Sequence, residues 1–238
     1  MYTLSELGPR IIIQFSNGLY ITESVIWTWI IMIGLIIASL ILTRNLKNEP
    51  GKVQALLETG VELLYSLVET TMGKQNSKVV PYFVGFLIFV FFCNVMGILG
   101  IRSTTADVNT TFAMGIIAFV LIQGMAIKKK GMPGHIKHMS EPYAFMFPIN
   151  LIGDLALPIS LAFRLFGNIL GGVIVMTLCY EATASLSHML GMSVPIFGLL
   201  LPIPLNIFFD LFEPALQAFV FAMLTMTFIG INTQVEEI

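Results

Sequence analysis

One arginine interrupts a long apolar stretch of the sequence, where a charged side chain is costly. Arg164 lies within Leu-Ala-Phe-Arg-Leu-Phe-Gly-Asn, and its nearest charged neighbour along the chain, Asp154, is ten residues away. A central arginine costs a membrane helix roughly 3 kcal/mol on insertion scales, and its guanidinium stays charged in proteins. Such residues usually line a polar pathway, although a permanent pair with a neighbouring carboxylate could instead staple two helices. We interpret Arg164 as part of a polar pathway.

Polar and small residues accompany Arg164 at helical spacing. Ser160 and Asn168 stand four residues before and after it, so the three polar groups share one stripe of a helix. Three glycines lie on or beside this face: Gly167, Gly171 and Gly172. Small residues at this spacing let another helix approach closely. Static packing is one interpretation, but beside an unpaired arginine the glycines indicate a partner helix whose own charge comes near the guanidinium.

Two carboxylates and an amide fall on one face of the last apolar segment. Asp210, Glu213 and Gln217 are spaced i, i+3 and i+7, which places them on the same side of an α-helix. They could hold a cation or pass protons. Alternatively, the two acids could reach water from a helix end, since Pro202 and Pro204 could delay the start of the helix.

The composition indicates that lipid, rather than water, solvates the elements that carry these residues. Of 238 residues, 56% are hydrophobic and 11% are charged, whereas a soluble domain is about a quarter charged. The net charge of −2 argues against nucleic-acid binding. The two cysteines, Cys93 and Cys179, suit neither a disulfide framework nor a metal site. The sequence has no GxxxxGK(S/T) nucleotide-binding motif, so we expect no catalysis of phosphoryl transfer by this chain alone. We also expect no cofactor and no metal.

The apolar segments predict an all-α, polytopic membrane protein with five spanning passes. About 18 apolar residues suffice to cross the hydrocarbon core. The predicted spanning helices are 25–42, 79–101, 108–127, 143–180 and 194–231. The last two carry Arg164 and Gln217 and exceed one perpendicular span, so we expect them to be tilted. Residues 52–73 are apolar on one face and acidic on another, which predicts an amphipathic interfacial helix. We expect residues 1–238 to form a single membrane domain.

The basic residues of the loops predict the orientation in the membrane. An N-terminus outside places nine of them in the cytoplasm and two outside, as the positive-inside rule requires. The nine are Arg44, Lys47, Lys52, Lys74, Lys78, Lys128, Lys129, Lys130 and Lys137, and the two are Arg10 and Arg102. Five passes then leave the C-terminus in the cytoplasm, and we expect a bacterial-type plasma membrane.

The charges of the apolar segments fall on opposite sides of Arg164. By their depth in the predicted spans, Glu181, Asp210 and Glu213 belong to the outer half of the membrane. Asp154 belongs to the inner half, and a solvated loop charge is the alternative for Glu181. Two polar pockets would then reach in from opposite faces, with a fixed positive charge between them. An ion could cross such a barrier only by boarding a moving carboxylate and leaving on the other side.

Four stretches of the sequence match a known family. Residues 160–168, around Arg164, resemble the signature of subunit a of F-type ATP synthases, the stator part of the ion channel. Residues 92–97 and 104–111 are similar to the family's second spanning helix and the turn after it, and 216–225 to its final helix. The resemblance runs in order from about residue 50 to residue 231 and implies that ion flow past this subunit drives rotation and ATP synthesis.

The resemblance also implies roles for individual residues. Arg164 would face the ring of c subunits, keep the carboxylate of the ring ionised and stop ions from short-circuiting between two half-channels. Gln217 matches the glutamine that faces this arginine, and the three glycines would face the rotor. Four further residues match positions along the ion path: Ser160, Asn168, Asp154 and Asp210. The implied partners are the c-ring of Fo, the b subunits of the peripheral stalk, the rest of the complex and membrane lipid.

The sequence departs from the family at one position of the outer pathway. Many members carry a glutamate nine residues after the arginine, where this chain has Val173. We expect the path to have moved to Asp210, Glu213 and Glu181, although outer access without a carboxylate at 173 is the alternative. Either H⁺ or Na⁺ could be the coupling ion. A self-contained secondary transporter or channel is the alternative function, but it usually shows internal repeats, which are not evident here.

Overall fold

The structure is a computed structural model that describes residues 10–14, 20–44, 46–47, 51–73, 79–101, 103–140, 143–190, 198 and 202–233. Five of its helices are long and apolar enough to cross a membrane. This confirms the predicted fold class, an all-α polytopic membrane protein. The exception is a short antiparallel hairpin of β1 (Ile11–Gln14) and β2 (Tyr20–Thr22), which the sequence analysis did not predict.

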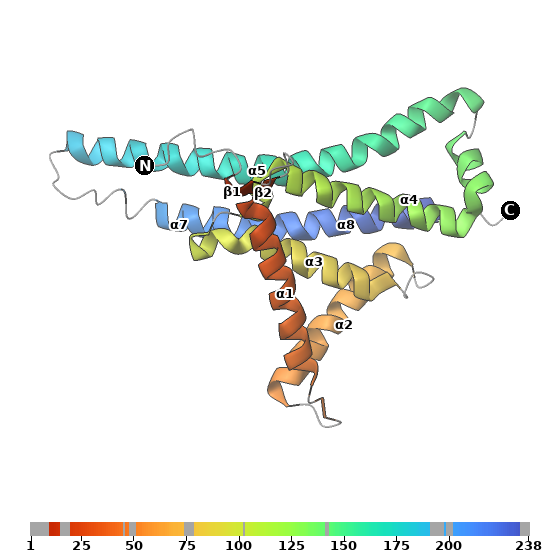
Figure 1. The fold of residues 1–238 in the computed structure, drawn as a ribbon, viewed down its shortest axis with the longest axis horizontal. Helices are drawn as coiled ribbons and strands as arrows, with labels where there is room; N and C mark the ends of the chain where they lie inside the picture. Colours follow the sequence, from red (N-terminus) through yellow and green to blue (C-terminus); the bar gives the residue numbers. More distant parts are fainter. Residues whose placement is uncertain are drawn as a thin grey trace. The chain divides into compact units, whose positions relative to one another are not determined.

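Helices account for nearly all of the remaining described residues (Figure 1). Their bounds are α1 Glu23–Thr43, α2 Lys52–Met72, α3 Val80–Val95, α4 Val108–Met139, α5 Phe147–Met189, α7 Pro202–Ile207 and α8 Glu213–Thr233. Three short 3-10 turns, Met96–Leu99, Thr104–Ala106 and Ala144–Met146, lie after α3, before α4 and before α5. A π-turn, Phe208–Phe212, joins α7 to α8 without a break in the chain's helical course.

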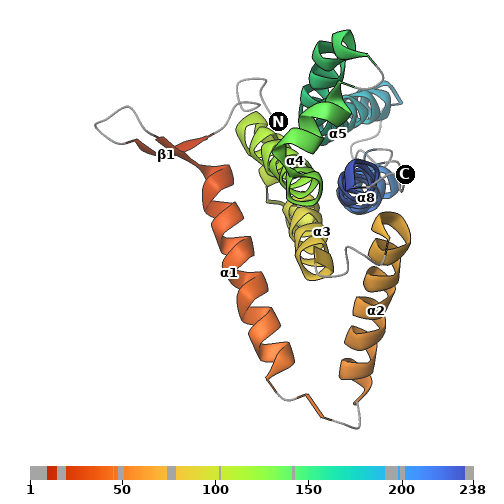
Figure 2. The same ribbon diagram turned by 90° about the vertical axis from the view of Figure 1, so that its right-hand side faces the viewer.

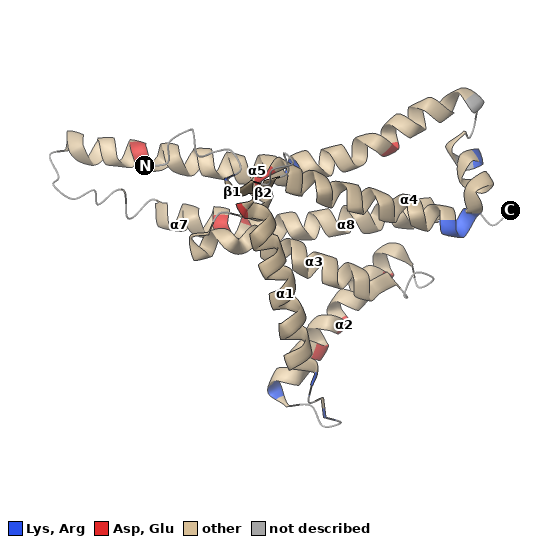
Figure 3. Ribbon diagram, in the orientation of Figure 1, with Lys and Arg blue, Asp and Glu red and all other residues tan. Residues whose placement is uncertain are grey.

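Charged residues are scarce along the long helices, although red patches of Asp and Glu lie along α2 and within α5 (Figure 3). Blue patches mark Lys and Arg at the far end of α4 and where α1 leads towards α2. Helix α4 continues through the basic residues 128–130 because lysine is a good helix former. The helical course is interrupted at Gly131, which has a positive φ of 71°, and Pro133 follows two residues later. The apolar part of α4 thus ends before the helix does.

The described chain forms two compact units that share its long helices. Unit 1 comprises residues 1–31, 90–111 and 163–218, and unit 2 comprises 32–89, 112–162 and 219–238. Each unit therefore combines segments that are far apart in the sequence.

Unit 2 contains a cluster of buried apolar side chains. Its buried side chains come from four helices, α2, α3, α4 and α8: Val68, Met72, Val80, Phe83, Ile122, Ala222, Met226 and Ile229. Figure 2 shows one end of α2 beside α8, and Gly230 permits this approach because a Cβ there would lie 3.0 Å from the carbonyl oxygen of Thr71. The other end of α2 is exposed, with Leu56 75% accessible. Helix α2 is thus anchored at one end and leaves an apolar face open at the other.

In unit 1, polar side chains connect the N-terminal hairpin to the start of α4. Asp107 is buried and caps this helix, since its Oδ1 accepts a hydrogen bond from the Asn109 amide at 3.0 Å. Its Oδ2 accepts a hydrogen bond of 3.3 Å from the hydroxyl of Thr22, at the end of β2. The buried carboxylate therefore joins the N-terminal hairpin to the turn that begins α4.

Candidate functional site

Arg164 projects from the exposed side of α5. Its side chain is exposed, although its neighbours Leu161 and Leu165 are buried in the same helix. Among the residues that the structure describes, its guanidinium has neither a hydrogen bond nor an ion-pair partner. The intramolecular staple considered above therefore has no counterpart in the described part of the chain. A charged group cannot be left against lipid tails without cost, so this surface needs a polar or protein partner.

A polar pair lies one helical turn beyond Arg164. The Asn168 amide nitrogen, on α5, donates a hydrogen bond of 2.8 Å to Oε1 of Gln217, on α8. Gln217 is only 6% exposed, and its Nε2 has no partner within the described chain. A buried donor left without a partner costs about 1–3 kcal/mol, so such a group calls for a functional or structural explanation. The pair links α5 to α8 and leaves one buried donor without a described partner.

Two of the three glycines lie beside open space. A Cβ built on Gly167 or Gly171 would meet no described atom within 4 Å. Gly172 differs, because it is buried and a Cβ there would lie 3.1 Å from Cδ1 of Phe209. Gly167 and Gly171 thus border open space within the described structure, whereas Gly172 packs against the π-turn of its own chain.

The carboxylates of the last segment lie in and just after the π-turn. Asp210 is half-buried at the centre of this turn, and Glu213 is the first residue of α8. The wider i→i+5 hydrogen bonding of a π-turn alters the regular α-helical register that the sequence analysis assumed, and such turns are frequent at functional sites. Oε2 of Glu213 is buried and has no described partner. The two acids thus have different environments in spite of their spacing.

Glu181 lies in the C-terminal third of α5, and its side chain is exposed. The preceding residue, Tyr180, accepts a hydrogen bond of 2.6 Å at its hydroxyl from the amide nitrogen of Asn206, on α7. This contact ties α7 to the segment of α5 that carries Glu181.

Two predicted site residues, Asp154 and Ser160, belong to unit 2. Oδ2 of Asp154 accepts a hydrogen bond of 2.8 Å from Nε2 of Gln123, on α4, and Ser160 is exposed. Sequence reasoning did not select Gln123. The signal was present, since it is the one amide side chain in the interior of the apolar segment 112–127.

Asn94 is a second amide that sequence reasoning missed, and it is buried. It lies in α3, is 1% exposed, and accepts a hydrogen bond of 2.6 Å at Oδ1 from the hydroxyl of Thr105. Its Nδ2 has no described partner. It is the one asparagine of the apolar segment 79–101, so a search for neutral amides in apolar segments would have found it.

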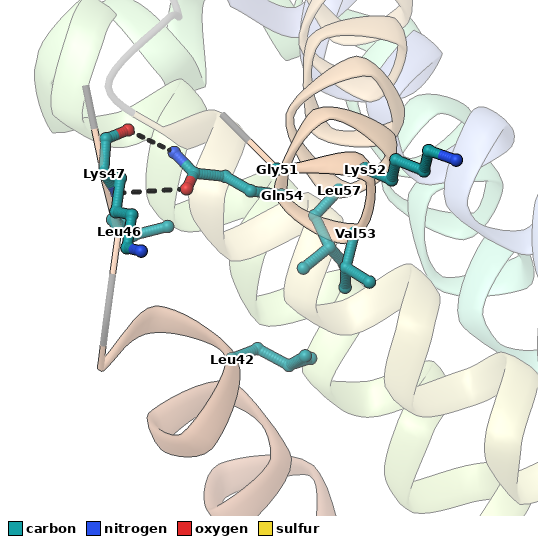
Figure 4. Close-up of a pocket in the computed structure, with 8 residues that line it drawn as sticks. All are labelled: Leu42, Leu46, Lys47, Gly51, Lys52, Val53, Gln54 and Leu57. Carbon is teal, nitrogen blue, oxygen red and sulfur yellow. Dashed lines mark hydrogen bonds between the residues drawn. The ribbon is translucent and has the colours of Figure 1, made fainter. Parts of the chain in front are cut away.

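A pocket at the junction of α1 and α2 differs from the site around Arg164 and the carboxylates, because no acidic side chain lines it (Figure 4). It has a volume of about 350 Å³ and is lined by Leu42, Leu46, Lys47, Gly51, Lys52, Val53, Gln54 and Leu57. The Gln54 amide bonds to the backbone of Lys47 through both its oxygen and its nitrogen, at 3.0 and 2.9 Å. These eight residues include no carboxylate. Within the described ranges, no group of three or more His, Cys, Asp or Glu is placed to hold a metal ion.

The fold and the Arg164 face together define a multi-pass membrane subunit that works with a partner. A family profile described as "ATP synthase A chain" matches residues 25–230. The chain therefore belongs to the ATP synthase subunit a family, which confirms the resemblance drawn from the sequence. Its function is that of the non-catalytic membrane stator subunit of an F-type ATP synthase, in ion transport coupled to ATP synthesis. The alternative of a self-contained transporter has no comparable support.

Curated relatives named ATP synthase subunit a are similar in sequence to most of this chain. ATP synthase subunit a of Moorella thermoacetica is 34% identical over 211 residues, which are 88% of this chain and 90% of that protein. The subunit a of Desulforamulus reducens is 35% identical, over 87% of this chain and 78% of the relative. A protein of Propionigenium modestum named "ATP synthase subunit a, sodium ion specific" is 31% identical, over 91% of this chain and 76% of the relative.

Proposed function

We propose that this subunit provides two offset half-channels to a ring of c subunits, with Arg164 between them. The observation that carries the proposal is the exposed guanidinium, which has no ion-pair partner within the described chain. A passing rotor carboxylate supplies the missing partner and remains ionised beside the guanidinium because an opposite charge favours its charged form. An ion must then leave the rotor on one side of Arg164 and board it on the other.

The neighbours of Arg164 suit a surface against which another helix moves. Gly167 and Gly171 lack side chains and lie beside open space, so a rotor helix can approach the α5 backbone. The hydrogen bond between Asn168 and Gln217 holds an amide beneath this surface, where the Nε2 of Gln217 is buried and has no partner within the described chain. Gly172 has no part in this surface because it packs against Phe209.

The acidic residues supply the two access routes. Asp210, Glu213 and Glu181 serve the outer half-channel, and Asp154 serves the inner one, with Ser160 beside the route. The hydrogen bond from Gln123 orients the Asp154 carboxylate. This assignment places the N-terminus outside and the C-terminus in the cytoplasm of a bacterial-type plasma membrane, and treats residues 1–238 as one membrane domain.

The implied partners are the c-ring, the b subunits of the peripheral stalk and membrane lipid. The exposed face of α5 around Arg164 is the surface proposed for the c-ring. The open apolar face of α2, which includes Leu56, suits lipid or a stalk subunit.

Substitution of Arg164 tests the proposal. Arg164→Ala should abolish ATP synthesis driven by an imposed ion gradient in membrane vesicles that contain the complete complex. Arg44→Ala, at the exposed end of α1, is the matched control and should retain synthesis. Immunoblots of the purified complex check that both variants assemble. Normal coupled synthesis in an assembled Arg164→Ala complex would contradict the proposal.

A second measurement separates this function from an autonomous channel. The chain reconstituted without c subunits should carry no selective H⁺ or Na⁺ flux, because no moving carboxylate bridges the half-channels. Robust selective flux through the chain alone would contradict the stator mechanism.

A further inference from the structure

The absence of a side chain at Gly97 creates the space in which the Asp210 carboxylate lies. A Cβ built on Gly97 would be 2.9 Å from Oδ1, 3.4 Å from Cγ and 3.7 Å from Cβ of Asp210. The first distance is shorter than carbon–oxygen packing permits. Gly97 does not have a positive φ, so backbone conformation does not account for the glycine. The contact with Asp210 accounts for the glycine, because a side chain at position 97 would occupy the space of the carboxylate.

Three further contacts fix the segment that presents Asp210 to Gly97. The 3-10 turn Met96–Leu99, which contains Gly97, packs against the π-turn Phe208–Phe212. Phe209, beside Asp210, fits against the bare surface of Gly172. The hydrogen bond of Asn206 to Tyr180 holds the preceding helix, α7. The position of the carboxylate is therefore determined by packing on both sides of the π-turn.

The three outer carboxylates differ in how they could exchange an ion. Glu213 is half-buried, as Asp210 is, but its Oε2 is buried and has no described partner. Glu181 is exposed. Asp210 alone is both held against a neighbouring segment and half-exposed. Asn94, three residues before Gly97, adds a buried amide whose Nδ2 has no described partner. An ion acceptor needs this combination, since it must be fixed in place and yet reachable by water.

We propose that Gly97 is a positioning residue for ion transport: its bare backbone seats Asp210 as the carboxylate that accepts the ion in the outer half-channel. The proposal rests on the function proposed above and names the group of that half-channel that binds H⁺ or a monovalent cation. A methyl group at 97 displaces the carboxylate without altering its chemistry.

The direct test compares two glycines of the same spanning segment. Gly97→Ala should lower gradient-driven ATP synthesis by at least about tenfold, because small displacements of reacting groups carry large rate penalties. It should also raise the external ion concentration needed for half-maximal synthesis. Gly85→Ala is the matched control, since no described atom lies within 4 Å of a Cβ at that exposed position of α3, and it should leave both quantities unchanged. Rates are normalised to the amount of assembled complex.

A double-mutant cycle and a swap make the test specific. Gly97→Ala should have no further effect in an Asp210→Asn background, because the side chain that the methyl group displaces can then no longer accept an ion. The swap Gly97→Asp with Asp210→Gly returns a carboxylate to the same space and should synthesise ATP at least tenfold faster than Asp210→Gly alone, about 1.4 kcal/mol. Equal rates in Gly97→Ala and Gly85→Ala, or an assembled swap no faster than Asp210→Gly, would overturn the inference.

The controls distinguish this inference from the function on which it rests. If Arg164→Ala abolishes synthesis while Asp210→Asn does not, the stator mechanism stands and the role of Gly97 is refuted. If Arg164→Ala leaves synthesis normal, the proposed function fails first.

Discussion

The apolar core of unit 2 and the polar segments of unit 1 use the same kind of helix for opposite purposes. In unit 2, Phe83, Val80 and Ile229 are buried among apolar neighbours, and the carboxylate of Asp154 has an amide partner in Gln123. In unit 1, three buried polar atoms lack partners within the described chain: Asn94 Nδ2, Glu213 Oε2 and Gln217 Nε2. We infer that unit 2 supplies stability, whereas unit 1 keeps polar groups available for ions.

The largest expected effect is on the stability of unit 2. Phe83→Ala should destabilise the subunit by about 3–5 kcal/mol, because it opens a cavity in the buried cluster. The amount of assembled complex and its thermal stability in detergent would measure the loss. Phe92→Ala, at an exposed position of the same helix, is the control and should assemble normally. Equal stability of the two variants would contradict the placement of Phe83 in the stabilising core of unit 2.

Gln217→Leu should affect activity more than stability. It removes the amide with the unpartnered donor, so we expect gradient-driven synthesis to fall about ten- to a hundredfold, the effect of one hydrogen bond to a charged group. Stability should change little, because removal of the buried unpartnered donor offsets loss of the hydrogen bond from Asn168. Thermal unfolding and ATP synthesis measured on the same preparation decide the matter. A Gln217→Leu complex that is less stable but synthesises ATP at the normal rate would contradict this prediction.

Gln123→Leu, in unit 2, should lower the stability of the subunit, in contrast to Gln217→Leu in unit 1. Loss of the hydrogen bond to Asp154 should cost about 1–2 kcal/mol of stability, since a half-buried carboxylate loses its partner. Gln123→Asn is the control, because it keeps the amide on a shorter side chain and should show a smaller loss of stability. Gln123→Glu is less suitable because it adds a charge. Unchanged thermal stability in Gln123→Leu would show that the contact contributes nothing.

The smallest expected effects distinguish two adjacent glycines of α5. Gly172→Ala should lower thermal stability by about 1 kcal/mol, as its methyl group would overpack against Phe209. Gly171→Ala should leave the stability of the subunit unchanged, because a Cβ there meets no described atom, but it should slow synthesis in the complex if the rotor passes over it. Slower synthesis in Gly172→Ala alone would place the rotor surface elsewhere.

Hydropathy predicted the fold class because long apolar segments in lipid have few alternatives to the helix. The five spanning helices and the amphipathic helix therefore followed from the sequence. The hairpin of β1 and β2 did not, since two strands of three or four residues give too short a pattern. The π-turn was equally unpredictable, because the regular spacing of Asp210 and Glu213 fits an α-helix and local packing against Gly97 and Gly172 is not visible in one sequence.

The candidate site was predictable to the extent that its residues are costly in lipid. Arg164 stood out by charge alone, and Asn168 and Gln217 by their positions on helical faces. The pairing of these two amides required the tertiary structure, because they are 49 residues apart. Asn94 and Gln123 do not stand out by charge, although a neutral amide in an apolar segment is also unusual.

The most direct test of the central role of Arg164 measures ion leak and synthesis together. In vesicles with the assembled Arg164→Ala complex, we predict that gradient-driven ATP synthesis is lost while passive ion flux through the membrane sector rises above that of the wild-type complex. Both changes follow if the guanidinium is the barrier between the half-channels. An assembled variant that remains both tight to ions and fully coupled would contradict the account.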